Sequence, residues 1–208
     1  MTMLDRLAAR AAPHGLIVMG ALHDGGRTIV LLGAGPEFWP VFTASGEYAD
    51  GTPDPVDRWS RRVIGDLAPG LETVFPFGGP PYAPFLKWAR DSGAAWDSPV
   101  GMLVHDTAGL MISYRGAVVF PGELPLPPRP VAPPCAGCAA PCATACPVDA
   151  LSAERGYDVT ACHAFLDTEA GRDCLTQGCR ARRACPVSRA FGRDPAQSAF
   201  HMKAFHPT

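Results

Sequence analysis

Long hydrophobic runs are missing from this chain of 208 residues. Its longest apolar stretches, Leu16–Leu22 and Thr28–Leu32, have the length of a strand and stop at glycine or near charged residues. A membrane-spanning helix needs about 20 apolar residues, so no membrane association is expected. The first residues carry Asp5, Arg6 and Arg10 in a short helical pattern instead of the apolar core of a signal peptide. We therefore expect a cytoplasmic protein.

An excess of charge of either sign is also absent. The chain has 18 Lys and Arg against 20 Asp and Glu, a formal net charge of -2. Proteins that bind nucleic acids by neutralising phosphates are strongly basic, so no nucleic-acid partner is expected.

Common catalytic motifs are missing too, because there is no G-x-S-x-G, no H-E-x-x-H and no P-loop. Gly33-Ala-Gly35 lacks the third glycine of a dinucleotide fingerprint.

Cysteine is absent from the first 134 residues, whereas all eight cysteines lie between Cys135 and Cys185. Without an export signal, this density predicts metal binding. The first four follow the pattern C-x2-C-x3-C-x3-C-P, which ends at Cys146-Pro147 and is one residue longer than the bacterial ferredoxin run C-x2-C-x2-C-x3-C-P. A second group ends in Cys185-Pro186. Eight thiolates are the number that two 4Fe-4S clusters require.

The resemblance to two-cluster ferredoxins implies which thiols belong together. In those proteins the fourth cysteine of the run binds the other cluster. It therefore implies a first set of Cys135, Cys138, Cys142 and Cys185 and a second set of Cys146, Cys162, Cys174 and Cys179. Two four-thiolate zinc sites are the main alternative, although zinc sites seldom combine three closely spaced thiols with C-P. Disulfides are the least favoured interpretation.

Other polar residues lie close to these thiols. His163, beside Cys162, is either a variant ligand or a residue outside the ligand shell, and we favour the latter because eight cysteines suffice. An arginine-rich segment surrounds the last thiols and consists of Arg180, Arg182, Arg183, Arg189 and Arg193. It either receives an acidic electron-donor protein or forms a solvated helix face.

A proline-rich segment divides the chain. Residues 121–134 read PGELPLPPRPVAPP, with proline at seven of fourteen positions, which predicts a stiff extended linker between domains of residues 1–120 and 135–208. The first domain is expected to be α+β, with helices against an antiparallel sheet. Its expected helices are 3–12, 37–44, 55–67 and 83–91, and its expected strands are 15–22, 28–33, 101–105 and 110–120. In the second domain, a helix capped by Asp158 or Thr160 is expected to carry Cys162.

The block GMLVHDTAGLMISYRGAVVFPG, residues 101–122, resembles the closing part of the cobalamin-binding domain in the CblC cobalamin-processing family. The similarity extends to Asp54-Pro-Val-Asp57, to the helix after it and to the exit Glu123–Pro128. Epoxyqueuosine reductase is similar in another way, since it joins a cobalamin domain of flavin-reductase/nitroreductase-like fold to a two-cluster ferredoxin module. Both resemblances imply cobalamin. The chain departs from both families. Its first domain is shorter than theirs, and it has no match for the catalytic acid of epoxyqueuosine reductase. The CblC family, in turn, has no iron-sulfur clusters.

The resemblance implies a cobalamin site, in which His105 and Arg115 are expected to be catalytic. The glycine-proline turn Phe77-Gly-Gly-Pro-Pro-Tyr82 is included on its own residues, because bare backbone could approach a flat corrin closely. The residues expected in the site are Phe77, Gly78, Gly79, Pro80, Tyr82, Val100, Gly101, His105, Tyr114, Arg115 and Gly116. The glycine-proline turn could equally be structural, and His105 could equally complete its own loop. Arg115 needs an anionic partner if buried, and a cobalamin phosphate, a carboxylate of a thiol cosubstrate or a local Asp would each serve. The Asp-x-His-x-x-Gly motif that supplies a histidine to cobalt is absent, so no strong lower ligand is expected.

These patterns predict an oxidoreductase that binds cobalamin, reduces its cobalt and removes its upper ligand by decyanation or dealkylation. Electrons would come from reduced ferredoxin, flavodoxin or a flavin reductase and pass through the clusters. One alternative is a cobalamin-dependent reductase of an organic substrate, related to epoxyqueuosine reductase or to reductive dehalogenases. Another is an electron carrier without cobalamin. The sequence specifies no oligomeric state, and a dimer is one option.

Overall fold

The fold is described by a computed structural model that covers residues 1–129 and 132–207. The chain divides into two compact units. The upstream unit comprises Met1–Ala95 and Ser113–Pro130, and the cysteine unit comprises Trp96–Ile112 and Val131–Thr208. Residues 96–112 therefore group with the cysteines, whereas the linker pattern assigned them to the first domain. Residues 130 and 131 of the predicted linker lie outside the described residues.

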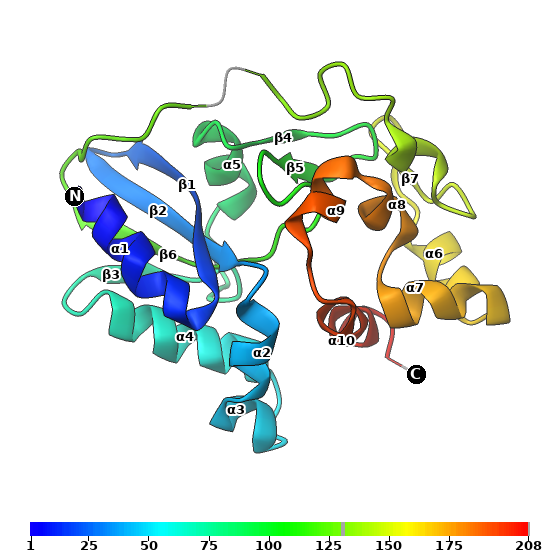
Figure 1. The fold of residues 1–208 in the computed structure, drawn as a ribbon, viewed down its shortest axis with the longest axis horizontal. Coiled ribbons are helices and arrows are strands. Elements are labelled where there is room, and N and C mark those ends of the chain that lie inside the picture. Colours follow the sequence, from blue (N-terminus) through cyan, green and yellow to red (C-terminus); the bar gives the residue numbers. More distant parts are fainter. Residues whose placement is uncertain (130–131, 208) are drawn as a thin grey trace. The chain divides into compact units, whose positions relative to one another are not determined.

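The upstream unit is built on one antiparallel sheet in the order β1-β2-β6-β3 (Figure 1). Its strands are β1 Leu16–Asp24, β2 Arg27–Ala34, β3 Glu72–Val74 and β6 Tyr114–Pro121. Gly25 and Gly26 join β1 to β2 with positive φ angles of 59° and 73°, the conformation that a two-residue hairpin turn requires and that glycine adopts without strain. Seven of the eight residues of β2 are buried, so both faces of the sheet are covered.

Helices α4 (Pro55–Leu67) and α5 (Phe85–Asp91) cover opposite faces of this sheet. A side chain at Gly20 on β1 would meet Ser92, next to α5, and then Leu31, whereas one at Gly116 on β6 would meet Ile64 of α4. Gly116 pairs with Leu32, and neighbouring residues of a strand point to opposite faces. The helices of this unit are α1 Met3–Ala11, η1 Ala12–His14, α2 Phe38–Thr43, α3 Gly46–Ala49, α4 Pro55–Leu67 and α5 Phe85–Asp91.

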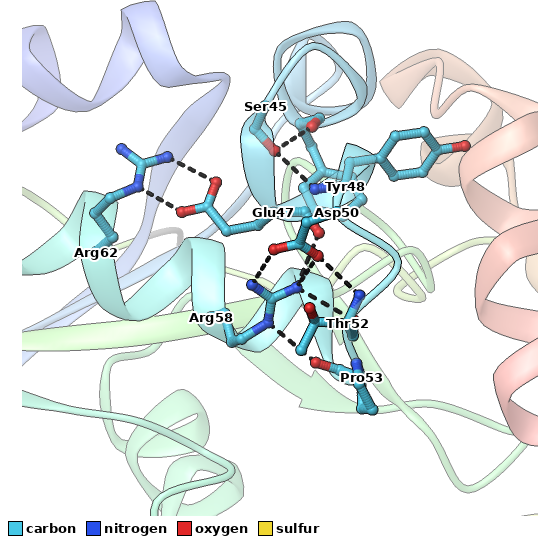
Figure 2. Close-up of polar contacts among 9 residues, drawn as sticks. Ser45, Glu47, Tyr48, Asp50, Thr52, Pro53, Arg58 and Arg62 are labelled. Carbon is cyan, nitrogen blue, oxygen red and sulfur yellow. Dashed lines mark hydrogen bonds and ion pairs between the residues drawn. The ribbon is translucent and has the colours of Figure 1, made fainter.

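Two arginines of α4 hold the segment that precedes it, as Figure 2 shows. Arg58 donates to both carboxylate oxygens of Asp50 at 2.8 Å, and also to the carbonyls of Glu47, Thr52 and Pro53. Arg62 binds both carboxylate oxygens of Glu47, at 2.5 and 3.0 Å. These contacts tie α3 and the following loop to α4, which begins one residue after Asp54 and carries Asp57 in its first turn.

The cysteine unit consists of short elements. The pairs β4 Ala95–Asp97 with β5 Leu103–His105 and β7 Leu151–Ser152 with β8 Gly156–Tyr157 form two small sheets. The helices are η2 Pro141–Thr144, α6 Val159–Leu166, η3 Glu169–Gly171, α7 Arg172–Gln177, α8 Arg180–Ala184, α9 Pro186–Phe191 and α10 Pro195–Phe205. Asp158 caps α6 by accepting the N–H of Ala161 at 2.9 Å. Asp158, one of the two predicted caps, is therefore confirmed.

The predicted α+β class and most predicted elements are confirmed, with one clear exception. The strand expected at 110–120 begins only at Tyr114, because the backbone before it bonds elsewhere. The N–H of Leu110 donates to the Ser188 hydroxyl, and its carbonyl accepts from Arg182. The short strands β3 and β4 were not predicted. Within the described residues, no helix is long and apolar enough to cross a membrane.

Candidate functional site

The first set of thiols surrounds a cavity in the cysteine unit. Cys135, Cys138, Cys142 and Cys185 all line it. The empty volume is about 380 Å³, part of it open to solvent. The remaining walls are formed by Ser98, Val104, Leu110, Pro134, Ala140, Pro186 and Val187. The structure thus brings together the four thiols that the ferredoxin pattern assigned to one set.

Local backbone features aim these thiols at the cavity. The N–H of Cys138 donates to the carbonyl of Cys135, which closes the C-x2-C loop as a turn, and Gly137 adopts a positive φ of 74° within it. Cys142 lies in η2 and is buried. Cys185 directly precedes α9, whose first residue is Pro186, a residue well suited to a first helical position. The Cys-Pro pair therefore ends one segment and starts the next helix at the thiol.

The thiols of this set influence one another electrostatically. Burial raises the pKa of Cys142, and the Cys185, Cys135 and Cys138 thiols raise it further. Burial likewise raises the pKa of Cys135, with Cys185 and Cys138 adding to the effect. Such mutual repulsion means that the thiolates would need a positive charge among them, which a bound metal supplies.

Three thiols of the second set lie on short helices or directly before one. Cys162 lies on α6, Cys174 on α7, and Cys179 directly precedes α8. Burial raises the pKa of Cys162; the Tyr157 hydroxyl opposes this by hydrogen bonding, whereas Cys179 and Cys146 reinforce it. Burial also raises the pKa of Cys174, and Cys179 contributes in the same direction. Cys146 itself accepts the N–H of Ala150 at 3.3 Å.

The arrangement of the thiols bears on the kind of metal group they could hold. No three His, Cys, Asp or Glu side chains in the described part of the chain converge closely enough to bind a single metal ion. The first set instead lines the wall of a cavity. A single zinc ion requires its ligands about 2.3 Å from one point, whereas an iron-sulfur cube places its thiolates around a larger body. Thiolates spaced along a cavity wall are the kind of donor set that a 4Fe-4S cluster uses.

The arginines near the last thiols make internal contacts. Arg180 donates to Asp173 at 2.7 Å, and Arg183 contacts the same carboxylate. Arg182 donates to the carbonyl of Leu110 at 2.7 Å. Arg193 contacts the carbonyl of Met111, and Arg189 that of Arg183. These side chains hold helices and residues 110–111 in place, which favours the structural interpretation of the arginine-rich segment.

His163 belongs to a chain of hydrogen bonds that the sequence did not reveal. Its Nδ1 lies 2.5 Å from Nδ1 of His206, whose Nε2 lies 2.9 Å from the Asp167 carboxylate. The His163 ring also stacks on Phe205, with ring centroids 4.5 Å apart. The partners come from the end of α6 and the end of the chain, more than 35 residues apart, so spacing carries no signal for them. The contacts agree with a residue outside the ligand shell.

In the upstream unit, Arg115 is paired with Asp57. The guanidinium side chain is 15% exposed, and its Nη1 lies 3.4 Å from the Asp57 carboxylate. Its Nε donates to the carbonyl of Tyr114 at 2.9 Å. Burial lowers the pKa of Arg115 and raises that of Asp57, and each charge partly opposes the shift of the other. A local Asp, one of the three partners considered for Arg115, is therefore present, although the contact is long for a charged hydrogen bond.

The other predicted cobalamin residues of this unit differ in what they contact. Phe77 stacks on Phe75, and the Arg61 guanidinium lies 4.8 Å from the Phe77 ring centre. Gly116 packs against α4, because a Cβ there would lie 2.7 Å from Ile64. Its small size thus serves helix packing. The predicted turn contains Gly78, Gly79, Pro80 and Tyr82, and Tyr82 is 67% exposed. Tyr114 is buried, with its ring centroid 6.2 Å from that of Phe85.

Three predicted cobalamin residues belong to the cysteine unit instead. Val100 is part of the apolar core next to the first set of thiols. Gly101 has a positive φ of 74°, and a side chain on it would meet the Ser152 carbonyl at 2.9 Å. His105 is 3% exposed, and its Nδ1 accepts the N–H groups of Thr107 and Ala108 at 3.1 and 3.3 Å. His105 therefore completes its own loop.

Comparisons with known proteins add no assignment. No protein-family model, no curated protein sequence and no solved structure matches the chain.

Proposed function

We propose that the protein is a cobalamin-binding iron-sulfur oxidoreductase that reduces cobalamin and thereby removes its upper ligand. In this proposal the upstream unit is a cobalamin domain of flavin-reductase/nitroreductase-like fold, and the cysteine unit is a ferredoxin-like domain with two 4Fe-4S clusters. Bound clusters supply single-electron transfer. The eight thiolates hold them, and reduced ferredoxin, flavodoxin or a flavin reductase is the proposed donor.

The observation that carries the proposal is the cavity lined by all four thiols of the first set. In the second set, Cys179 and Cys146 help to raise the pKa of Cys162, and Cys179 helps to raise that of Cys174. In the proposed grouping Cys146 joins the later thiols and Cys185 the earlier ones, which agrees with the effect of Cys146 on the pKa of Cys162 and of Cys185 on the pKa of Cys142. This exchange is the pattern that ferredoxins use to hold two clusters close together.

Support for cobalamin comes from the CblC-like block and from Arg115. A nearly buried guanidinium with one long carboxylate contact has N–H groups left for an anionic ligand. The ligand phosphate or the carboxylate of a thiol cosubstrate would suit them. The block itself is divided, because its first half, up to Ile112, belongs to the cysteine unit and its second half to the upstream unit.

Metal analysis of the full-length protein tests the cluster part of the proposal. Anaerobically purified protein should contain about eight irons and about eight sulfides per chain. Zinc without sulfide would refute it.

Anaerobic titration with cobalamins, followed by visible spectroscopy, tests the cobalamin part. We expect saturable band shifts that report a displaced nucleotide base, because the chain lacks the histidine motif for cobalt. A chain with full iron content and an unchanged cobalamin spectrum would favour the electron carrier. Cobalamin binding without loss of the upper ligand on reduction would favour a reductase of an organic substrate.

A further inference from the structure

Ser98 is the polar exception in the wall of the first cavity. Besides the four thiols, the described lining residues are apolar except for this serine. Ser98 is 3% exposed, and its Oγ has no hydrogen-bond partner among the residues that the structure describes. A buried hydroxyl without a partner is destabilising, so its presence at a cavity wall points to a partner inside the cavity.

The backbone holds Ser98 firmly at this position. Its N–H donates to the Met102 carbonyl, and its own carbonyl accepts from Gly101, both at 3.0 Å. The turn is also anchored to the residue after β7, because the N–H of Ala153 donates to the Pro99 carbonyl at 3.2 Å. Gly101 approaches the Ser152 carbonyl so closely that a side chain would not fit. The hydroxyl is thus placed by a rigid turn.

We propose that Ser98 donates its O–H to a sulfur of the cluster held by Cys135, Cys138, Cys142 and Cys185, an inference that rests on the proposed function. Reduction adds negative charge to a cluster and its thiolates, and a hydrogen-bond donor stabilises the more negative state. Ser98 therefore raises the reduction potential of the first cluster above that of the same cluster without this hydrogen bond.

The test is a potentiometric titration of the full-length protein followed by electron paramagnetic resonance. In Ser98→Ala the midpoint potential of the first cluster should become more negative, while the second cluster and the iron content stay unchanged. Each tenfold loss in the reduced-to-oxidised ratio corresponds to 59 mV for a one-electron couple. The signals are assigned with Cys142→Ala and Cys162→Ala, each of which removes a thiol of one set.

Two comparisons separate the effect of the Ser98 hydroxyl from the effect of its side-chain packing. Ser98→Thr and Ser98→Val have nearly the same shape, so only the valine variant should lower the potential, and this pair decides the question if the alanine variant folds poorly. Ser60→Ala is a matched control in α4, where a buried hydroxyl donates to the Val56 carbonyl. It should leave both potentials unchanged.

Failure of the inference is distinguishable from failure of the proposed function. A protein without iron and sulfide refutes both. A protein with both clusters in which Thr and Val at position 98 give equal potentials overturns the role of Ser98 alone. Equal shifts of both clusters in Ser98→Ala would overturn it as well, because they indicate a general change in the unit.

Discussion

At the scale of single residues, Arg115 can be tested both for its pairing with Asp57 and for the proposed binding of cobalamin. Arg115→Gln removes the cation that is paired with the half-buried Asp57 carboxylate. We expect the free energy of unfolding to fall by about 1–3 kcal/mol at neutral pH, the typical cost of an unpaired buried polar group. Cobalamin-induced stabilisation should fall as well, because it follows the ratio of ligand concentration to dissociation constant. Denaturant unfolding with and without cobalamin measures both effects.

The double variant Asp57→Asn/Arg115→Gln is the control. It removes both charges, so it should be more stable than Arg115→Gln alone. Without Arg115, the raised pKa of Asp57 should rise further, since burial is its largest cause and Arg115 opposes it. A carboxyl with a raised folded-state pKa destabilises above that pKa, so the single variant should approach the wild type as pH falls towards about 4. If Arg115→Gln were less stable than the wild type by the same amount at all pH values, the pairing of Arg115 with Asp57 would be contradicted.

The Arg58–Asp50 pair should make a contribution to the free energy of unfolding that depends on pH. The hydrogen bonds from Arg58 are the largest cause that lowers the pKa of Asp50, to about 2. A carboxyl with a lowered folded-state pKa stabilises above its unfolded value, near 4, and this contribution is lost as pH falls through about 2. The stability difference between the wild type and Arg58→Ala should therefore narrow between about pH 4 and 2.

The stability difference between the wild type and Arg58→Ala should not vanish at low pH. Arg58 also donates to the carbonyls of Glu47, Thr52 and Pro53, which do not titrate. Asp50→Asn should remove the pH-dependent part alone. Thermal unfolding across this pH range provides the measurement, and a gap that widens on acidification would contradict the assignment.

At the scale of elements, the cap of α6 positions one thiol of the second set. Asp158 accepts the N–H of Ala161, and Cys162 lies in the first turn of the same helix. Asp158→Ala should lower the free energy of unfolding by about 1 kcal/mol, whereas Asp158→Asn should lose much less because asparagine is an equally good cap. Chemical unfolding of the two variants measures the difference. Equal losses would show that the cap is not what the side chain contributes.

The segment of residues 96–112 shows how tertiary contacts override local pattern. Its apolar residues predict a strand continuing to Phe120, yet the strand starts at Tyr114. Ser188 accepts the N–H of Leu110, and a side chain on Gly109 would lie 2.4 Å from the Ser188 nitrogen. Hydrogen bonds to α8 and α9 therefore replace those of a sheet. In β1 and β2, by contrast, the strands that the apolar residues predict do form, because the two backbones hydrogen-bond to each other.

At the scale of the whole molecule, the two thiol sets predict how cysteine replacements combine. Cys146→Ala should lose one cluster and keep about four irons. Adding Cys162→Ala should remove no more iron, because both thiols belong to the second set. Adding Cys142→Ala, which lies closer in the sequence, should remove nearly all of it. Iron analysis of the two double variants decides the grouping, and additive loss for Cys146 with Cys162 would refute it.

The sequence alone determined the features that depend on local spacing. Eight cysteines with two Cys-Pro ends predict two four-thiolate sets, which stay a prediction. Hydrophobic periodicity predicts the α+β class, the bounds of α4, and those of α1, β1 and β2 to within one or two residues. A proline-rich stretch marks where regular structure stops. These properties follow from neighbouring residues, whose geometry is set by the backbone.

Only the tertiary structure decided the features that depend on distant contacts. Asp57 meets Arg115 across 58 positions, and Ser98 reaches a cavity whose thiols begin at Cys135. Residues 96–112 precede the proline-rich stretch but pack with the cysteines that follow it. No spacing encodes such pairs, because they arise from burial and from backbone groups finding partners once the chain has folded.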